Sequence, residues 1–250
     1  MSLLGVQRHG SGPPLVWLHG FTQTRDSAHQ FRSILAGTNE VLTLDLPGHG
    51  ENAAIVASLD ETADLLDDVL PLEDFALGGY SFGARVALHF ALRYPARVTR
   101  LVLLGATRGT HDDAERAARR RGDDELADRI ESIGAEAFLD EWLRRDMFAS
   151  LPNDPGERAA RSRDATGLAN SLRHAGTGTQ RWLAPELASL SVPTLALAGS
   201  IDQKFSLEAS AIAEGVKNGK SAFIDDAHHA AHLEQPAPSA AVVSSFISRF

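Results

Sequence analysis

Short apolar runs alternate with longer amphipathic stretches along most of the chain. The runs are followed by glycine-containing turns and cover residues 15–19, 41–46, 75–80, 98–104, 194–198 and, more weakly, 221–224. Runs of this length are typical of strands buried on both faces of a parallel sheet. Helical periodicity fills the intervals, at residues 28–35, 58–70, 81–94, 207–216 and 239–250. This alternation predicts an α/β fold, with a mostly parallel sheet and helices on both of its faces.

One segment, residues 107–186, departs from the alternation. It has no convincing strand pattern, whereas helical patterns extend over 113–133 and 135–145. The segment holds 13 of the chain's 21 arginines, none of its three lysines, and 16 acidic residues. We therefore predict a core of residues 1–106 and 187–250, and a helical insertion of residues 107–186 over the loop edge of the sheet. We call this insertion the cap, and expect most of its arginines to lie on solvated helix faces.

Composition narrows the possible functions. The 250 residues carry a net charge of −9 and include no cysteine, which excludes disulfides, thiolate metal sites and a cysteine nucleophile. The acidic balance argues against a general nucleic-acid or anionic-membrane binder. No apolar run approaches the roughly 20 residues that cross a bilayer, and the start of the chain lacks the apolar core of a signal peptide. We expect a soluble, cytoplasmic protein with no nucleic-acid, membrane or obligate protein partner.

The strongest chemical motif is Gly79-Tyr-Ser-Phe-Gly83, which fits the pattern G-x-S-x-G. An apolar strand leads into it and an amphipathic helix leaves it, which is the context of a nucleophilic serine on a sharp turn. The glycines keep side chains away from the neighbouring backbone, and the helix N-terminus surrounds Ser81 with free N–H groups. The alternative interpretation is a serine that merely caps the helix.

A reactive serine needs a base, and the base needs a carboxylate that orients it. Asp202 follows the apolar run 194–198 and is the predicted carboxylate, although it could instead cap the next helix. Three histidines, His228, His229 and His232, follow the run 221–224, and spacing alone does not choose between the first two. A metal site is the alternative for such a cluster. No further set of His or carboxylate residues has ligand spacing, so we expect neither a metal nor a cofactor.

The same chemistry needs N–H donors for a developing oxyanion. One apolar run ends in His19-Gly20-Phe21, which places the backbone N–H of Phe21 near the end of a strand. Together with the N–H of Phe82, it forms the predicted oxyanion hole. A second turn of this kind, residues 45–50, is expected to be structural.

Over essentially its whole length the chain resembles the α/β-hydrolase superfamily, and within it the 2-succinyl-6-hydroxy-2,4-cyclohexadiene-1-carboxylate (SHCHC) synthases of menaquinone biosynthesis. The similar stretches are residues 79–87, Trp142 with 148–151, 168–178, 202–205 and 229–236. The resemblance identifies His229 as the base, because it precedes Glu234 and Pro236 by the interval usual in the superfamily. The chain departs from the family at His228 and Ala84, where glycine is usual.

The resemblance implies a lyase that eliminates pyruvate from 2-succinyl-5-enolpyruvyl-6-hydroxy-3-cyclohexene-1-carboxylate. Ser81, polarised by His229 and Asp202, would remove the proton next to the succinyl carbonyl, and the oxyanion hole would hold the enolate. Such a small polycarboxylate substrate demands local cations. Arg85 lies one helical turn after Ser81, where an unpaired guanidinium is costly unless an internal carboxylate or an anionic ligand meets it. The other candidate substrate-binding residues are Tyr80, Arg116, Arg119, Arg121, Trp142 and Lys204.

Two other functions are compatible with these residues. A carboxylesterase or thioesterase would use Ser81 as a true nucleophile, would form an acyl-enzyme, and would have no need of Arg85. A ligand-binding protein without catalysis ranks lower, because such proteins often lose one member of the triad and this chain retains all three.

Overall fold

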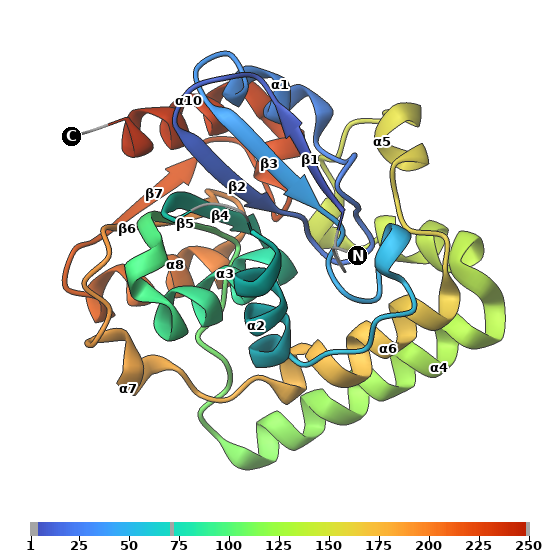
Figure 1. Cartoon of the computed structure of the whole chain (residues 1–250). Helices are drawn as coiled ribbons and strands as arrows, with labels where there is room; N and C mark the ends of the chain where they lie inside the picture. Colours follow the sequence, from blue (N-terminus) through green and yellow to red (C-terminus); the bar gives the residue numbers. More distant parts are fainter. Residues whose placement is uncertain (1–4, 71–72, 249–250) are drawn as a thin grey trace.

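A seven-stranded sheet forms the centre of the computed structural model, which describes residues 5–70 and 73–248 (Figure 1). The strand order is β1-β3-β2-β4-β5-β6-β7, and all neighbouring strands are parallel except β1 and β3. The strands are β1 (Val6–His9), β2 (Pro14–Leu18), β3 (Glu40–Leu44), β4 (Phe75–Tyr80), β5 (Val98–Leu104), β6 (Thr194–Gly199) and β7 (Gly219–Ile224). The predicted fold class is confirmed.

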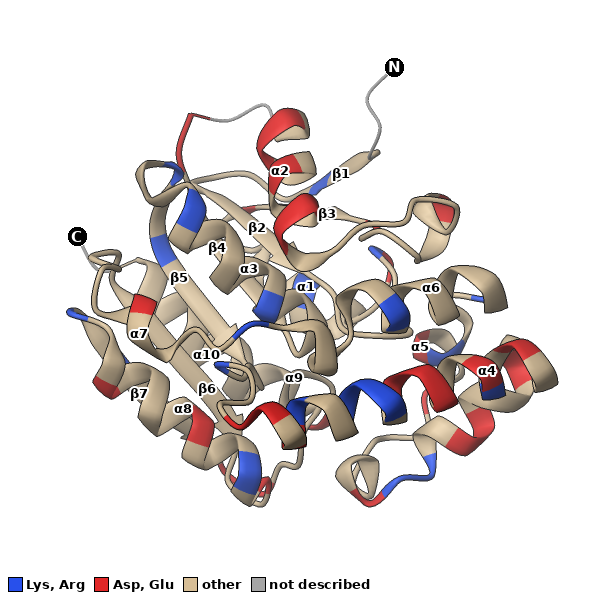
Figure 2. Ribbon diagram, turned by 90° about the horizontal axis from the view of Figure 1, so that it is seen from below, with Lys and Arg blue, Asp and Glu red and all other residues tan. Residues whose placement is uncertain are grey.

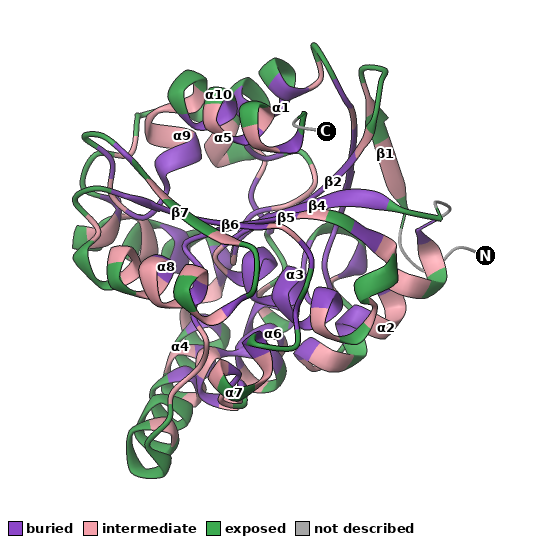
Figure 3. Ribbon diagram, turned by 90° about the vertical axis from the view of Figure 1, so that its left-hand side faces the viewer, coloured by how far each residue is buried: buried purple, intermediate pink, exposed green. Residues whose placement is uncertain are grey.

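Helices cover both faces of the sheet (Figure 3). One layer contains α1 (His29–Leu35), α9 (Ala231–Glu234) and α10 (Pro236–Ile247); the other contains α2 (Leu59–Val69), α3 (Phe82–Arg93) and α8 (Gln203–Gly215). Each layer encloses its own apolar core against the sheet, around Leu77 and Phe90 on the α3 side and around Trp17 and Phe31 on the α1 side. Burial on both faces explains why the central strands have continuous apolar sequences.

Sequence reasoning missed β1. This strand has four residues, pairs only with β3 among the described strands, and has no fully buried position, so its apolar signal is weak. Helix boundaries also differ from prediction. Helix α8 begins at Gln203 because the carboxylate of Asp202 accepts a hydrogen bond from the backbone N–H of Phe205 at 3.3 Å. The helix expected over 239–250 begins at Pro236, and the last two residues of that expectation lie outside the described residues.

Between β5 and β6 the described chain contains helices and turns but no strand. Helix α4 (Asp113–Leu143) is interrupted at Gly134, whose φ of 80° breaks the helical geometry between the two predicted helical patterns. Helices α5 (Pro155–Ala159), α6 (Ala165–Ala175) and α7 (Ala184–Leu187) follow. A small apolar cluster joins α4 to α6, whereas the outer side of α4 carries alternating bands of acidic and basic residues (Figure 2). Across residues 5–70 and 73–248, we find no helix long and apolar enough to span a bilayer.

Candidate active site

The turn between β4 and α3 presents Ser81 to a pocket. Ser81 has φ 52° and ψ −104°, a strained conformation for a residue other than glycine. Its backbone N–H donates to the carbonyl of Leu104 on the neighbouring strand at 2.7 Å. A Cβ on Gly83 would lie 2.3 Å from the carbonyl oxygen of Leu18, so only glycine permits this approach of helix to strand. The strained turn is thus fixed by both neighbouring strands.

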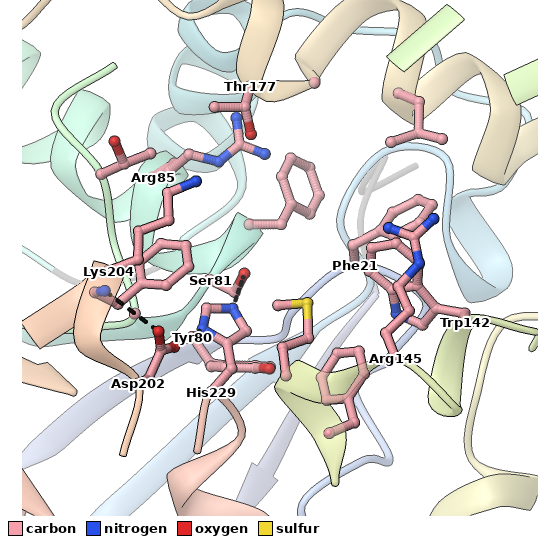
Figure 4. A pocket seen from close by; sticks show the side chains of 18 of the residues that line it. Phe21, Tyr80, Ser81, Arg85, Trp142, Arg145, Thr177, Asp202, Lys204 and His229 are labelled. Atoms are coloured by element: carbon pink, nitrogen blue, oxygen red, sulfur yellow. Dashed lines mark hydrogen bonds and ion pairs between the residues drawn. The ribbon is translucent and has the colours of Figure 1, made fainter. Parts of the chain in front are cut away.

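The structure brings Ser81, His229 and Asp202 together from three separate loops (Figure 4). The Nε2 atom of His229 lies 2.9 Å from Oγ of Ser81, and its Nδ1 atom lies 2.9 Å from Oδ2 of Asp202. A carboxylate only accepts, so Nδ1 carries the proton and Nε2 accepts from the serine hydroxyl. Asp202 also caps α8 through its other oxygen, so both interpretations of this residue hold at once. The arrangement is that of a proton relay.

The loop after β7 separates the three candidate histidines. The ring of His228 points instead to Ser150, with Nδ1 lying 2.9 Å from the serine Oγ. His232 is buried beneath Tyr80 and outside this relay, with ring centroids 4.3 Å apart. The carboxylate of Glu234 accepts from the backbone N–H of His228 at 2.7 Å and of Ala230 at 3.0 Å. These two hydrogen bonds hold the backbone on both sides of His229, which gives the spacing between His229 and Glu234 a physical reason.

Two neutral histidines brace the loop that contains Phe21. His19 accepts from the backbone N–H of Leu46 at 3.0 Å, and His49 accepts from the N–H of Thr22 at 3.3 Å. Burial lowers the pKa of His19 to about 4 and that of His49 to about 3, so both rings are uncharged near neutral pH. The ring of His49 also stacks on Phe82, with centroids 5.4 Å apart. Phe21 and Phe82, the two residues of the predicted oxyanion hole, therefore both contact the ring of His49. Both residues also line the pocket.

Arg85 is a buried cation beside the relay. Its guanidinium donates to the carbonyl of Ala175 at 2.9 Å and lies 5.5 Å from the ring centre of Phe82. In the described part of the chain, no carboxylate oxygen comes within 4.0 Å of it. Burial lowers the pKa of Arg85 to about 10, opposed by the more distant Asp123, so the group stays charged at neutral pH. Burying a charge without a counter-ion is costly in free energy. The guanidinium lines the pocket, so an anionic ligand there could act as its counter-ion.

The pocket has a volume of about 260 Å³ and lies between the strand-end loops and the cap. Arg85, Thr177 and Lys204 lie on one side of Ser81, and Phe21, Trp142 and Arg145 on the other (Figure 4). Trp142 packs edge-on against Phe21, and its buried indole N–H has no hydrogen-bond partner among the described residues. Tyr80 also lines the pocket with its ring against His229, and burial raises the pKa of its hydroxyl. The walls thus combine aromatic surface with positive charge.

The predicted cap arginines fall into two groups. Arg119 lines the pocket, where it pairs with the buried carboxylate of Asp123 at 2.9 Å. Arg116 and Arg121 lie outside the pocket, and Arg116 pairs with Asp113 on the surface at 2.5 Å. Helical periodicity did not reveal which side of α4 faces α6 and the pocket, because polar residues surround the first half of the helix.

Sequence reasoning missed Arg145, which lines the pocket next to Trp142. Its guanidinium lies 4.4 Å from the ring centre of Trp142, a cation–π contact. Ten of the 13 cap arginines lie within 4.0 Å of a described carboxylate; Arg121, Arg144 and Arg145 do not. Of these three, Arg145 alone lines the pocket. Because Arg144 and Arg145 are adjacent, nothing in the sequence distinguishes the one that faces the pocket.

The described residues contain no group of three or more His, Asp or Glu side chains placed to hold a metal ion. The pocket brings together a serine–histidine–aspartate relay, backbone N–H groups at the start of a helix, and four cationic side chains, Arg85, Arg119, Arg145 and Lys204.

Comparison with known proteins agrees with the fold. The sequence profile of the α/β hydrolase fold matches residues 13–236. The chain belongs to the α/β-hydrolase fold family.

Within that family, the chain is similar to proteins named as SHCHC synthases. One from Photorhabdus laumondii is 32% identical over 95% of this chain and 86% of its own length. A Bacillus subtilis protein, which carries the same name provisionally, is 34% identical over 94% of this chain and 90% of its own length. Among solved structures, MenH from S. aureus superimposes with a TM-score of 0.90 at 30% identity, over 99% of this chain and 98% of that one. A thermophilic esterase from Thermogutta terrifontis, solved with malate bound, has a TM-score of 0.82 at 26% identity, over 98% and 92% of the two chains.

Proposed function

We propose that this protein is a lyase of menaquinone biosynthesis that eliminates pyruvate from 2-succinyl-5-enolpyruvyl-6-hydroxy-3-cyclohexene-1-carboxylate. The product is the compound for which the related synthases are named. The proposal assigns catalysis to Ser81, His229 and Asp202, and substrate binding to the aromatic and cationic residues of the pocket.

The relay supplies a base that needs no covalent intermediate. In the proposed step, the Ser81 oxygen takes the proton next to the succinyl carbonyl while its own proton passes to Nε2 of His229, 2.9 Å away. Asp202 stabilises the imidazolium that forms. The electron pair released from the C–H bond moves into the carbonyl, where the N–H groups of Phe21 and Phe82 stabilise the enolate. As the enolate collapses, the carbonyl re-forms, the ring double bond shifts by one position and the allylic ring carbon–oxygen bond breaks. The departing enolate of pyruvate takes up a proton from the imidazolium of His229 to become pyruvate, which returns the relay to its starting state.

The observation that carries the proposal is the buried guanidinium of Arg85, on the helix that follows Ser81, which has no carboxylate oxygen within 4.0 Å among the described residues. An arginine fits a carboxylate with two parallel hydrogen bonds, and a carboxylate would compensate the cost of burying the charge. Among the residues that line the pocket, Asp202 is the one carboxylate and it is engaged with His229, whereas four residues are cationic. This excess of positive charge suits a substrate with several carboxylates.

We propose that residues 107–186 act as a cap that closes the pocket over the substrate. Three observations support this role. Trp142, Arg145 and Phe148 line the pocket from the cap side, and the carbonyl of Met147 accepts from the backbone N–H of His229 at 3.3 Å. The carbonyl of Ala175 holds Arg85 from the same side. The cap thus contacts both the base and the proposed substrate-binding cation.

An esterase is the second candidate, because the same relay and N–H groups could support an acyl-enzyme, and the Thermogutta terrifontis relative is an esterase. An esterase differs from the lyase because its pocket does not need a cation. A neutral ester has no group for Arg85 to bind.

The experiment that tests the function supplies the substrate, generated in situ by the preceding enzyme, and follows pyruvate and diene formation beside hydrolysis of a nitrophenyl ester. We expect pyruvate release that depends on the enzyme and falls at least about 10³-fold in Ser81→Ala, because the base is lost. Ser206→Ala, on α8, is a matched control because its hydroxyl bonds the carbonyl of Gly199. Efficient ester cleavage without pyruvate release would replace the lyase by the esterase.

A further inference from the structure

Glu157, on helix α5 of the cap, is a buried carboxylate to which the proposed mechanism gives no role. Its side chain is 11% exposed. One oxygen accepts from the backbone N–H of Ala28 at 2.7 Å, and the other accepts from the side-chain amide of Gln23 at 3.2 Å. Both partners belong to the loop between β2 and α1, the loop that contains Phe21. A cap side chain is therefore hydrogen-bonded to the proposed oxyanion loop at two points.

Gln23 connects Glu157 to the backbone of Gly20, at the start of the loop that contains Phe21. Because the Glu157 carboxylate can only accept, the amide nitrogen of Gln23 faces it and the amide oxygen faces the other way. That oxygen accepts from the backbone N–H of Gly20 at 2.8 Å. The backbone N–H of Gln23 in turn donates to the carbonyl of Gly20 at 3.1 Å. Gln23 is 1% exposed, so these bonds are protected from water.

The carbonyl of Gly20 belongs to the same planar peptide group as the N–H of Phe21. This carbonyl is held by two donors, the backbone N–H of Gln23 and Nδ1 of His19 at 2.9 Å. In a trans peptide the N–H and C=O point in opposite directions, so fixing the carbonyl of Gly20 fixes the direction of the Phe21 N–H. A shift of Gln23, or of the Glu157 carboxylate that holds it, would therefore change the direction of the Phe21 N–H.

The next residues of the cap hold the same loop in a strained conformation. Thr22 has φ 68° and Ala28 has φ 58°, both in the left-handed region. The guanidinium of Arg161 donates to Oγ1 of Thr22 at 2.7 Å, and the N–H of Ser162 donates to the Thr22 carbonyl at 2.8 Å. Such conformations persist where surrounding contacts determine them. Here the contacts come from residues 157–162.

We propose that Glu157 is a positioning residue, which through Gln23 sets the direction of the Phe21 N–H, so that docking of residues 157–162 completes the oxyanion hole. This inference rests on the oxyanion role of Phe21 in the proposed function. It links a cap residue that touches neither relay nor pocket to the rate of the chemical step.

The test compares Glu157→Gln with Glu136→Gln. Glu157 lies 3.8 Å from the guanidinium of Arg161. Glu136 is likewise a cap carboxylate paired with arginine, but it is 61% exposed and bonds Arg158 and Arg163 within the cap. A glutamine at position 157 has one acceptor for two donors, so one of the two bonds is lost. We expect kcat to fall about 10-fold with KM within about twofold, less than the roughly 10²-fold effect of deleting an oxyanion donor. Glu136→Gln should match the wild type.

Gln23→Met breaks the same connection from the other end and provides a second variant. We expect a similar fall in kcat, and a double variant no slower than the worse single one, because both changes remove one linked set of bonds. Glu157→Asp, which retains the charge, should recover part of the rate. An unchanged kcat, an effect confined to KM, or additive losses in the double variant would overturn the inference.

The readouts separate this inference from the proposed function. Each variant is assayed for pyruvate release and for nitrophenyl ester cleavage, since both reactions need the oxyanion hole. If the wild type cleaves only the ester, the lyase proposal fails, and the kcat for the ester still decides the role of Glu157. If the wild type has neither activity, amide hydrogen exchange decides. Faster exchange at residues 20–22 in Glu157→Gln alone supports the inference, and unchanged exchange there overturns it.

Discussion

Ser81, Asp202 and His229 lie in loops at the ends of strands, and each is fixed by hydrogen bonds to another group of the core. The arginines of the cap contrast with them, because most are exposed and ten of the 13 pair with described carboxylates. Charge alone therefore does not identify a binding residue. In the core, backbone geometry sets the position of the catalytic side chains. In the cap, we infer a binding role only for a cation that faces the pocket and has no described carboxylate partner.

Arg85 belongs to the core, but like Arg145 it faces the pocket and has no described carboxylate partner. Its removal should therefore have the largest effect on turnover of an anionic substrate. We expect Arg85→Met to lower kcat/KM for pyruvate release about 100-fold, because one charge-assisted contact worth roughly 2–3 kcal/mol is lost. Cleavage of a neutral ester should change less than about threefold, within the spread of an uninvolved surface change. Arg93→Met, on the same helix but paired with Asp64 at the surface, is the control. Equal losses in both reactions would show a structural effect.

Arg145 sharpens the comparison within the cap. Arg145→Ala should raise KM for the anionic substrate about 10-fold with kcat little changed, because an exposed cation contributes mainly to binding. Arg144→Ala removes the adjacent arginine, which also lacks a described carboxylate partner but lies outside the pocket. It should leave KM within about twofold of the wild type, as expected for a surface charge. Similar KM values in the two variants would remove Arg145 from the site.

Buried histidines make the core sensitive to acid. Burial lowers the pKa of His19 to about 4 and that of His49 and His232 to about 3. Between these values and about 6.5 the unfolded chain binds protons that the folded chain does not, so the free energy of unfolding falls as pH falls. In urea unfolding at pH 7, 6 and 5, His232→Phe should lose stability less steeply than the wild type, by up to about 1.4 kcal/mol per pH unit. An identical pH dependence would contradict the assignment of a neutral, buried His232.

The smallest effect is expected from the cap arginines that lie outside the pocket. Arg116→Ala and Arg121→Ala should change kcat/KM less than about twofold, because exposed ion pairs and exposed charges contribute little. Steady-state kinetics at low and at physiological salt check this expectation. A loss near that of Arg85→Met in either variant would mean that the criterion of a pocket-facing, unpaired cation is wrong.

The sequence predicted those parts of the molecule that local chemistry determines. The apolar runs predicted six strands, of which the central ones are buried on both faces, and Gly83 helped to predict the turn because a Cβ there would collide with the carbonyl of Leu18. The edge strand β1 escaped notice because it is short and partly exposed. Arg145 escaped notice because its importance depends on which way the chain turns after α4 ends, and Glu157 because its importance depends on contacts with a loop more than a hundred residues away. Neither property has a local signature.

In the proposed function, the guanidinium of Arg85 holds a carboxylate of the substrate next to the relay. Calorimetric titration of the Ser81→Ala protein with the reaction product tests it most directly, because binding is measured with no chemistry. We predict that Arg85→Met in this background weakens binding about 100-fold, the loss of roughly 2.7 kcal/mol, while the folded state is retained. Equal affinities of the two proteins for the product would contradict the claim.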